Sequence, residues 1–205
     1  YACRILVPGL SDIYPVDELI WRNNNEGAKF RQDFLSLDQY DAEQWLEIYD
    51  RLEEAGHSDI IRAAEFIGVV TDADTPWHTL RIGELKAHLC LAAQSEEAID
   101  WVEWILHTDQ ISPERIRFFR CLKAVLEIKY DEQRAYSTYQ SSLALMFGAD
   151  NVELAIEIAE ARIQFHGLSF PGLALEGFKK HHALLDGYRK LHRAKAQFWD
   201  RQVSD

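Results

Sequence analysis

The chain has 205 residues, of which 47% are hydrophobic and 27% charged, and its formal net charge at pH 7 is −12. This balance is typical of a folded globular protein and excludes an intrinsically disordered one. An acidic surface disfavours non-specific binding to nucleic acid, and there is no run of about 18 apolar residues that could enter a membrane. We therefore expect that a macromolecular partner would be a basic protein rather than a nucleic acid.

Residues 1–7 alternate as a β-strand does, with the odd-numbered side chains on one face, and Pro8-Gly9 ends the pattern. No second convincing strand follows. Because a strand needs a partner for its backbone N–H and C=O groups, we expect the partner strands to lie upstream, in a preceding domain.

Helical periodicity replaces the strand pattern from about Pro15 onward. Asp41 is expected to cap a helix that ends at Gly56, and Ser58 to open the next one. Residues 72–76 have the composition of a loop, and the helical period resumes at residue 77. The side chains expected to face the core are Trp45, Ile48, Tyr49, Leu52, Ile60, Ala64, Ile67, Ile82, Leu85, Leu89 and Ala92.

The second half continues in the same way. Ser95 is expected to cap one helix, and Ser112-Pro113 provides an N-cap followed by proline at the first helical position. Another helix ends before Gly148, a capping-box spacing at Asp150 opens the helix that Gly167 closes, and the last helix spans about 174–199. The expected inward residues are Ala98, Trp101, Val102, Ile105, Phe118, Cys121, Leu122, Val125, Tyr139, Leu143, Met146, Val152, Ala155, Ile156, Ala159, Ile163, Leu184, Tyr188, Leu191 and Phe198.

These patterns predict an all-α fold of antiparallel helical hairpins, with one N-terminal strand left from the preceding domain. A 34-residue tetratricopeptide period matches only weakly: Ala98 fits the small position of that repeat, but Glu132 occupies it one period later. The prediction is therefore a repeat-like, tetratricopeptide-like helical bundle.

Four segments resemble the YcaO family. Residues 1–15 look like the last strand and exit segment of the YcaO catalytic core. Residues 77–87, 101–104 and 191–199 are similar to the helical C-terminal extension of its enterobacterial members. The resemblance implies that residues 1–15 end the core and that residues 16–205 form the helical C-terminal domain.

The resemblance also implies a longer protein whose core binds ATP and magnesium, and whose enterobacterial members act as accessory factors in methylthiolation of a small-subunit ribosomal protein. The ligands for ATP and magnesium would lie upstream of Tyr1, so we expect no cofactor in this fragment and no catalysis by it. Azoline-forming members often end in a Pro-x-Pro-x-Pro tail, whereas this chain ends Gln202-Val-Ser-Asp205, which favours the accessory role.

No catalytic or metal site is predicted from the residues. Neither phosphate-binding glycine motif occurs, and the eight histidines lack zinc spacing: His181 and His182 are adjacent and would point about 100° apart on a helix. Cys3, Cys90 and Cys121 are far apart and show no paired spacing, which is typical of a reducing, cytoplasmic compartment.

A protein interface is the expected function. Trp101 and Trp104 share a helix face, and Trp199 lies near the end of the basic last helix. These tryptophans could instead be core residues, and the basic helix a solvated face. We predict a homodimer, with a basic ribosomal protein or a methylthiotransferase as a further partner; the alternative is a self-contained small-ligand-binding or enzymatic helical domain. The candidate interface residues are Trp101, Trp104, Arg189, Lys190, Arg193 and Trp199.

Overall fold

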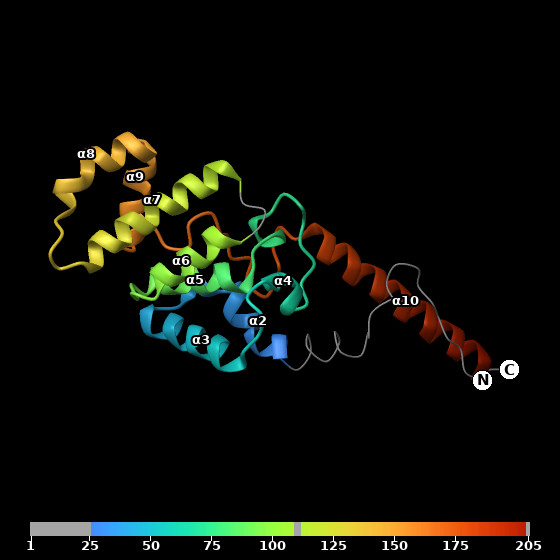
Figure 1. Cartoon of the computed structure of the whole chain (residues 1–205). Coiled ribbons are helices and arrows are strands. Elements are labelled where there is room, and N and C mark those ends of the chain that lie inside the picture. The colour runs from blue at the N-terminus through green and yellow to red at the C-terminus, as the bar shows by residue number, and fades with distance from the viewer. Residues whose placement is uncertain (1–25, 109–111, 204–205) are drawn as a thin grey trace. The chain divides into compact units, whose positions relative to one another are not determined.

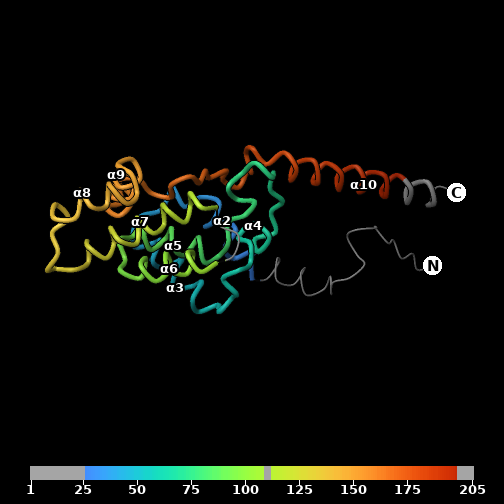
Figure 2. Tube along the Cα trace, turned by 45° about the horizontal axis from the view of Figure 1, so that its top comes forward, coloured from blue at the N-terminus to red at the C-terminus, as the bar shows by residue number. Residues whose placement is uncertain are grey.

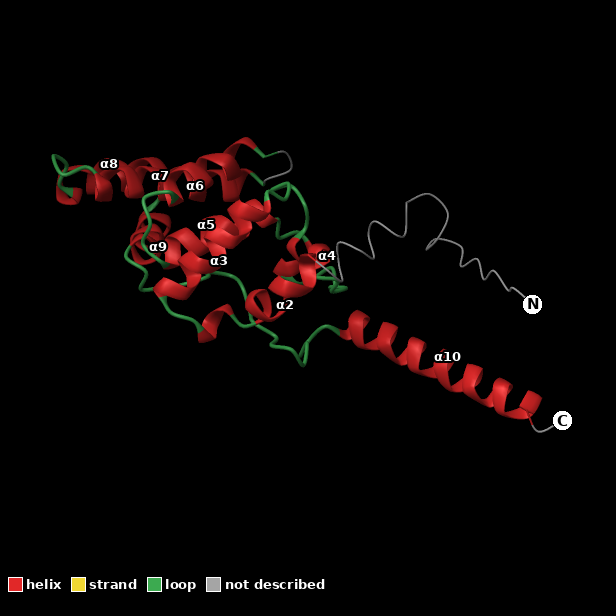
Figure 3. Ribbon diagram, turned by 90° about the horizontal axis from the view of Figure 1, so that it is seen from below, coloured by secondary structure: helices red, strands yellow, loops and turns green. Residues whose placement is uncertain are grey.

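The structure, a computed structural model, describes residues 26–108 and 112–203, and the side chains from residue 198 onward are not described. Within these ranges the regular elements are helices, apart from one isolated antiparallel bridge between Arg62 and Arg81 (Figure 3). The predicted all-α class is confirmed. The predicted strand at residues 1–7 and the domain boundary after residue 15 lie outside the described residues.

The chain folds as two compact units that are interleaved in sequence. Unit 1 combines the described part of the N-terminal segment up to residue 36 with residues 64–78 and residues from 171 onward. Unit 2 comprises residues 37–63 and 79–170. Each unit is described by itself below.

Unit 2 is a series of helical hairpins (Figure 1). Helix α3 packs on α5, α5 on α6 and α6 on α7, while α7, α8 and α9 pack on one another. The helices are α3 (Ala42–Ala55), α5 (Ile82–Ala92), α6 (Ala98–His107), α7 (Pro113–Tyr130), α8 (Tyr136–Phe147) and α9 (Ala149–Ala159), and a 3-10 turn, η2 (Leu37–Gln39), precedes them.

Local capping chemistry explains where two of these helices begin. The Asp41 carboxylate accepts the Gln44 N–H at 3.0 Å, while the Gln44 side chain accepts the Asp41 N–H at 3.0 Å. Gly56 then ends α3 with a φ of 62°, a left-handed conformation that glycine adopts without steric cost. At α7, Ser112 caps the helix and Pro113 follows at its first position. All three predictions are confirmed.

The core of unit 2 is apolar and aromatic. The Trp45 indole N–H donates to the Leu37 carbonyl at 2.9 Å, and the Trp45 ring packs edge-on against Phe165 with centroids 5.3 Å apart. Most of the predicted inward positions of α3, α5, α6, α7 and α9 are buried: Trp45, Ile48, Tyr49, Leu52, Ile82, Leu85, Leu89, Ala92, Ala98, Val102, Ile105, Cys121, Leu122, Val125, Val152, Ala155 and Ala159.

The described part of unit 1 contains two short helices, a 3-10 turn and the long last helix, which Figure 2 traces as one uninterrupted helix. Phe30, Phe34 and Phe66 form an aromatic cluster with ring centroids 5.7 to 6.2 Å apart. Trp77 is fully buried, and the Leu35 carbonyl accepts the Gly172 N–H at 2.9 Å. The elements are α2 (Gly27–Leu35), α4 (Ala63–Phe66), η3 (Pro76–His78) and α10 (Lys179–Val203).

Several predicted helix ends are wrong. The segment after Ser58 gives only the four-residue α4, and α5 begins at Ile82 because residues 76–78 form a 3-10 turn. Helix α6 begins after Glu97, since the Ser95 hydroxyl accepts the Glu97 N–H within a turn instead of capping the helix. The N-cap of α9 is Gly148, not Asp150.

The C-terminal ends also differ. Helix α9 stops at Ala159, before the predicted Ile163 and Gly167, because Ala161 takes a left-handed φ of 52° and its N–H bonds back to Ile158. The last helix begins at Lys179 rather than near residue 174.

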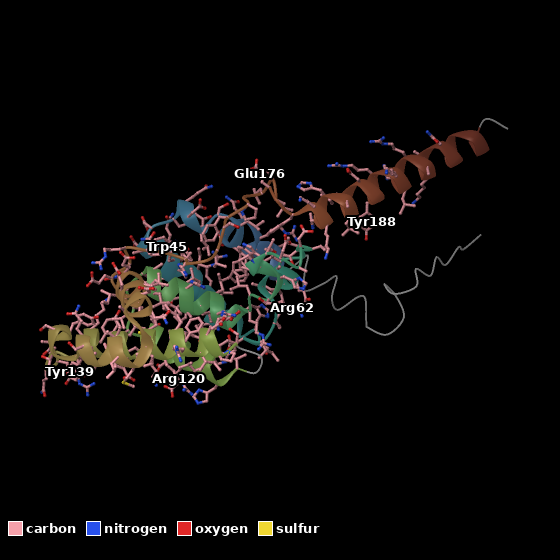
Figure 4. All side chains as sticks on the ribbon, turned by 90° about the horizontal axis from the view of Figure 1, so that it is seen from above. Trp45, Arg62, Arg120, Tyr139, Glu176 and Tyr188 are labelled. Carbon is pink, nitrogen blue, oxygen red and sulfur yellow. The ribbon has the colours of Figure 1, made fainter. Side chains whose placement is uncertain are left out.

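Before α10, three of the side chains predicted to face inward are exposed: Ile60 by 65%, Tyr139 by 38% and Met146 by 67%. Ile60 lies before α4 in non-helical chain, so the helical period does not apply to it. In α8 only Leu143 is buried, and Tyr139 projects from the helix surface (Figure 4). Periodicity identifies a common face but not the fraction of that face that a neighbour covers.

Candidate functional site

Helix α10 carries an exposed apolar stripe. Leu184, Tyr188 and Leu191 stand at positions i, i+4 and i+7, which places them on one face of the helix. They are 38%, 56% and 68% exposed, and Figure 4 labels Tyr188 on this helix. The prediction that this stripe faces the core is wrong for these three residues. The helical period shows that they share a face, but it does not show whether another element packs on that face. The fourth predicted position, Phe198, has no described side chain.

The same helix is strongly basic. Residues 179–203 contain seven lysines and arginines against two aspartates, a net charge of +5 that leaves −17 for the rest of the chain. The candidate interface residues Arg189, Lys190 and Arg193 are all exposed. Arg189 pairs with Asp186 at 2.9 Å, but both side chains are more than 60% exposed, so this pair adds little stability.

The two tryptophans of α6 are half-buried. The Trp101 indole N–H donates to the Tyr49 hydroxyl at 3.1 Å, and the rings of Trp101 and Trp104 meet edge-on with centroids 6.1 Å apart. Trp104 also covers Gly83, whose missing side chain makes room for the indole ring. The structure therefore brings Trp101 and Trp104 together. The cations of α10 belong to a different segment of the chain. The Trp199 side chain is outside the described residues.

A buried lysine lies beneath this aromatic pair. The Lys86 side chain is only 4% exposed, and its ammonium is 2.5 Å from Glu53 and 2.7 Å from Asp59. The ammonium also lies 4.6 Å from the centroid of the Trp101 ring, in cation–π contact. Because both carboxylates are partly exposed, this cluster links the interior of unit 2 to its surface.

Helices α7, α8 and α9 line a half-open pocket of about 190 Å³. Tyr136, the first residue of α8, lines it, and the Tyr136 hydroxyl is buried without a described hydrogen-bond partner. The lining residues are Val125, Ile128, Lys129, Arg134, Tyr136, Ile156, Ala159 and Glu160.

The buried thiols are poor nucleophiles. Burial raises the pKa of Cys121 to about 11 and that of Cys90 further, so both remain protonated at neutral pH. Among residues 26–108 and 112–203, no group of three or more His, Cys, Asp or Glu side chains could hold a metal ion. None of the helices described there is long and apolar enough to cross a membrane.

His88 is held neutral in the fold. Burial lowers its pKa from 6.5 to about 4, and the charges of Arg115 and His166 act in the same direction. The ring stacks against Phe165 with centroids 6.3 Å apart. An unfolded chain binds a proton at His88 below pH 6.5, whereas the folded chain does so only near pH 4.

The free energy of unfolding should therefore fall as the pH is lowered from 6.5 to 4. The contribution of His88 is fully present above pH 6.5, and we expect about 2 kcal/mol of it to be lost between pH 7.5 and pH 5. Urea unfolding at pH 7.5 and at pH 5 measures the loss. In a His88→Gln variant the same pH change should cost correspondingly less, whatever packing with Phe165 the variant loses; an equal loss in both proteins would contradict the assignment.

A family model for the YcaO cyclodehydratase C-terminal domain matches residues 27–197, which is most of the chain. The chain belongs to this family. The resemblance noted in residues 77–87, 101–104 and 191–199 is thereby confirmed, and all of unit 2 and much of α10 lie within the matched YcaO C-terminal domain.

Two relatives extend the match to nearly the whole chain. The ribosomal protein S12 methylthiotransferase accessory factor YcaO of Escherichia coli K12 is 42% identical over 204 residues, which cover 97% of this chain. An uncharacterised protein of Haemophilus influenzae Rd is 39% identical over 205 residues. The chain spans 35% of the length of each relative, so it corresponds to a part of these longer proteins.

Sequence reasoning missed Lys86, His88 as a neutral group, and Tyr136. A lysine within the continuous apolar run of α5 is the one signal that could have identified Lys86 as buried, since the flanking Leu85 and Ala87 are both core residues. Nothing in the sequence distinguishes Tyr136 from the other tyrosines, because its environment is created by helices that meet only in the fold.

Proposed function

We propose that this chain is a non-catalytic helical interaction and oligomerisation module of a larger YcaO-type protein. The observation that carries the proposal is the apolar stripe of α10, exposed at Leu184, Tyr188 and Leu191 and accompanied by exposed cations. Exposed apolar surface beside charge is typical of a contact site. Membership of the YcaO C-terminal domain family and the protonated thiols support a role outside the chemical step.

A second copy of the same chain is the proposed first partner. Helix α10 carries +5 and the rest of the chain −17, so α10 of one copy complements the acidic surface of another. A two-fold contact uses the same pair of surfaces twice, so it neutralises charge on both copies.

The accessory role is extended to this chain from its relative. The Escherichia coli protein is named an accessory factor of the ribosomal protein S12 methylthiotransferase. We therefore propose the methylthiotransferase or its basic substrate as a further partner of the acidic surface. In this proposal residues 1–15 end an upstream core, residues 16–205 form the cytoplasmic helical domain, and ATP and magnesium bind only in the core.

Charge reversal on α10 tests the dimer. Arg189 and Arg193 are four residues apart and so share a face, and Arg189→Glu with Arg193→Glu replaces two positive charges with two negative charges, a change of four charge units. We expect dimerisation of the chain, measured by light scattering at low salt, to weaken about tenfold or more. Raising the salt concentration should weaken the unmodified dimer and reduce the difference between the two proteins.

The matched control is Arg117→Glu with Arg120→Glu. Both arginines are exposed on α7, where Figure 4 labels Arg120, and their reversal changes the net charge by the same amount. This control should retain the dimer. A chain that is monomeric at high concentration and low salt would rule out the homodimer, whereas a dimer that survives reversal at Arg189 and Arg193 would rule out α10 as the contact.

A further inference from the structure

Helix α8 presents an uncharged and largely exposed surface. None of its 12 residues is charged, although 27% of the residues in the chain are. Leu145 is 89% exposed, Met146 67% and Tyr139 38%. Tyr139 and Met146 stand at positions i and i+7, so they share a face of the helix, and Leu145 borders that face. An exposed apolar surface on one helix is typical of a contact with another protein segment.

The neighbouring helix α9 is acidic. It packs against α8 as the second arm of a hairpin (Figure 1). Asp150, Glu153 and Glu157 stand at positions i, i+3 and i+7 of α9 and share a face, and residues 136–160 contain no lysine, arginine or histidine. Within the described part of the chain, no cation forms an ion pair with any of the three carboxylates. The hairpin of α8 and α9 therefore combines exposed apolar side chains with unpaired negative charge.

Helix α10 has the complementary pattern. Its apolar stripe extends from Leu184 to Leu191, which is the same seven-residue spacing as from Tyr139 to Met146. Seven residues correspond to about 10.5 Å along a helix, so the two apolar faces have matching lengths. Exposed arginines accompany the stripe of α10, as the acidic face of α9 accompanies α8. Each surface thus offers the charge that the other lacks.

A glycine within the stripe of α10 indicates a close approach. Gly187 lies three residues after Leu184 and four before Leu191, so it belongs to the same helix face. Glycine destabilises a helix interior relative to alanine. A Cβ atom at Gly187 would meet nothing within 4 Å among the described residues, so no contact described within the chain accounts for a glycine here. A second helix that packs closely on the stripe does account for it, because glycine lets another segment approach the backbone.

We propose that the apolar stripe of α10 in one copy of the chain packs on the exposed face of α8 in a second copy, with the α10 arginines against the acidic face of α9. This inference rests on the dimer proposed above and names the surface that receives α10. Each copy supplies one α10 and one hairpin, so a two-fold dimer forms the same contact twice. The flexible Met146 side chain is suited to fill the space beside Gly187.

An exchange of charges between two chains tests the contact. Glu153→Lys with Glu157→Lys should weaken dimerisation, measured by light scattering at low salt, about tenfold or more, like the reversal at Arg189 and Arg193. An equimolar mixture of these two variants should recover dimers. In the mixed dimer the acidic α10 of one chain meets the basic α9 of the other, and the two unmodified surfaces also meet. A contact of α10 with its own chain would give no such recovery.

The matched control for charge is Glu43→Lys with Glu47→Lys on α3. Both glutamates are exposed and four residues apart, as Glu153 and Glu157 are, and their reversal changes the net charge by the same amount. This control should retain the dimer. Loss of the dimer in the control to the same extent would mean that net charge, rather than the α9 face, determines association.

The apolar part of the contact is tested separately. Leu145→Ser with Met146→Ser should weaken dimerisation about tenfold, because the contact would no longer bury these apolar side chains. Ile60→Ser, which removes another exposed apolar side chain, should leave dimerisation unchanged. Gly187→Leu should favour the isolated helix yet weaken the dimer, because its side chain occupies the space that the second helix needs. An unchanged or tighter dimer in Gly187→Leu would overturn the close approach.

The results separate this inference from the dimer itself. A dimer that survives the changes on both α8 and α9, or a mixture that recovers no dimer, would overturn the assignment of the acceptor surface and leave the homodimer standing. A chain that is monomeric at high concentration and low salt would overturn the homodimer and this contact together. Loss of the dimer in the α8, α9 and α10 variants, with recovery in the mixture, is the expected result.

Discussion

Replacement of Gly27 by alanine should destabilise unit 1 by about 3 kcal/mol or more. A Cβ atom at this position would lie 1.8 Å from the Phe66 carbonyl oxygen and 2.8 Å from its carbonyl carbon. Both are backbone atoms, so no side-chain rotation relieves the overlap, and α2 would have to move away from α4. That movement would separate Phe30 and Phe34 from Phe66 and open the aromatic cluster.

Urea unfolding and amide hydrogen exchange measure this effect. The exchange of α2 amides should rise more than that of the α5 amides in unit 2, because the overlap lies within unit 1. Gly187→Ala is the matched control: Gly187 is also helical, a Cβ there meets nothing within 4 Å, and alanine should stabilise α10 by up to about 1 kcal/mol. Equal stability of Gly27→Ala and the unmodified chain would show that α2 and α4 are less closely packed.

The helices that the sequence predicted best are those fixed by local chemistry. Asp41 and Ser112 cap helices through bonds to residues three positions along the chain, so the sequence itself contains both partners. Gly56 likewise ends α3 by its own backbone conformation. The all-α class follows from the same local periodicity, repeated along the chain.

The rest depends on contacts between distant segments. The close approach of Gly27 to Phe66 joins positions 39 residues apart, and a glycine at a helix start has no pattern that predicts it. The exposure of Leu191 was not predicted, because the helical period identifies the apolar face but not whether another element packs against it. Tyr136 acquires its buried hydroxyl only where α7, α8 and α9 meet.

Lys86 illustrates how such distant contacts determine energetics. Its helix was predicted, but the burial of its charge depends on Glu53 and Asp59, which lie 33 and 27 residues earlier. A buried charge is costly to leave without a partner, whereas removal of the charge itself is often tolerated. The cost of breaking this cluster should therefore depend on which side is changed.

Neutralising both carboxylates should be the more damaging change. Glu53→Gln with Asp59→Asn leaves the Lys86 ammonium 4% exposed without a counter-charge, and we expect a loss of about 3 kcal/mol in the free energy of unfolding. Lys86→Met preserves the length of the side chain, and Glu53 and Asp59, which are 45% and 30% exposed, can recover hydration. We expect Lys86→Met to cost about 1 kcal/mol or less.

Combining the three substitutions provides the decisive measurement. Adding Lys86→Met to the neutralised pair removes the unpaired ammonium, so it should restore about 2 kcal/mol of the stability that the pair lost. Urea midpoints of the four proteins, measured at one pH and salt concentration, give this coupling directly. Additive losses would mean that the ammonium recovers hydration on its own. A Lys86→Met variant as unstable as the neutralised pair would mean that the ion pairs themselves stabilise unit 2, and that the loss does not come from an unpaired buried charge.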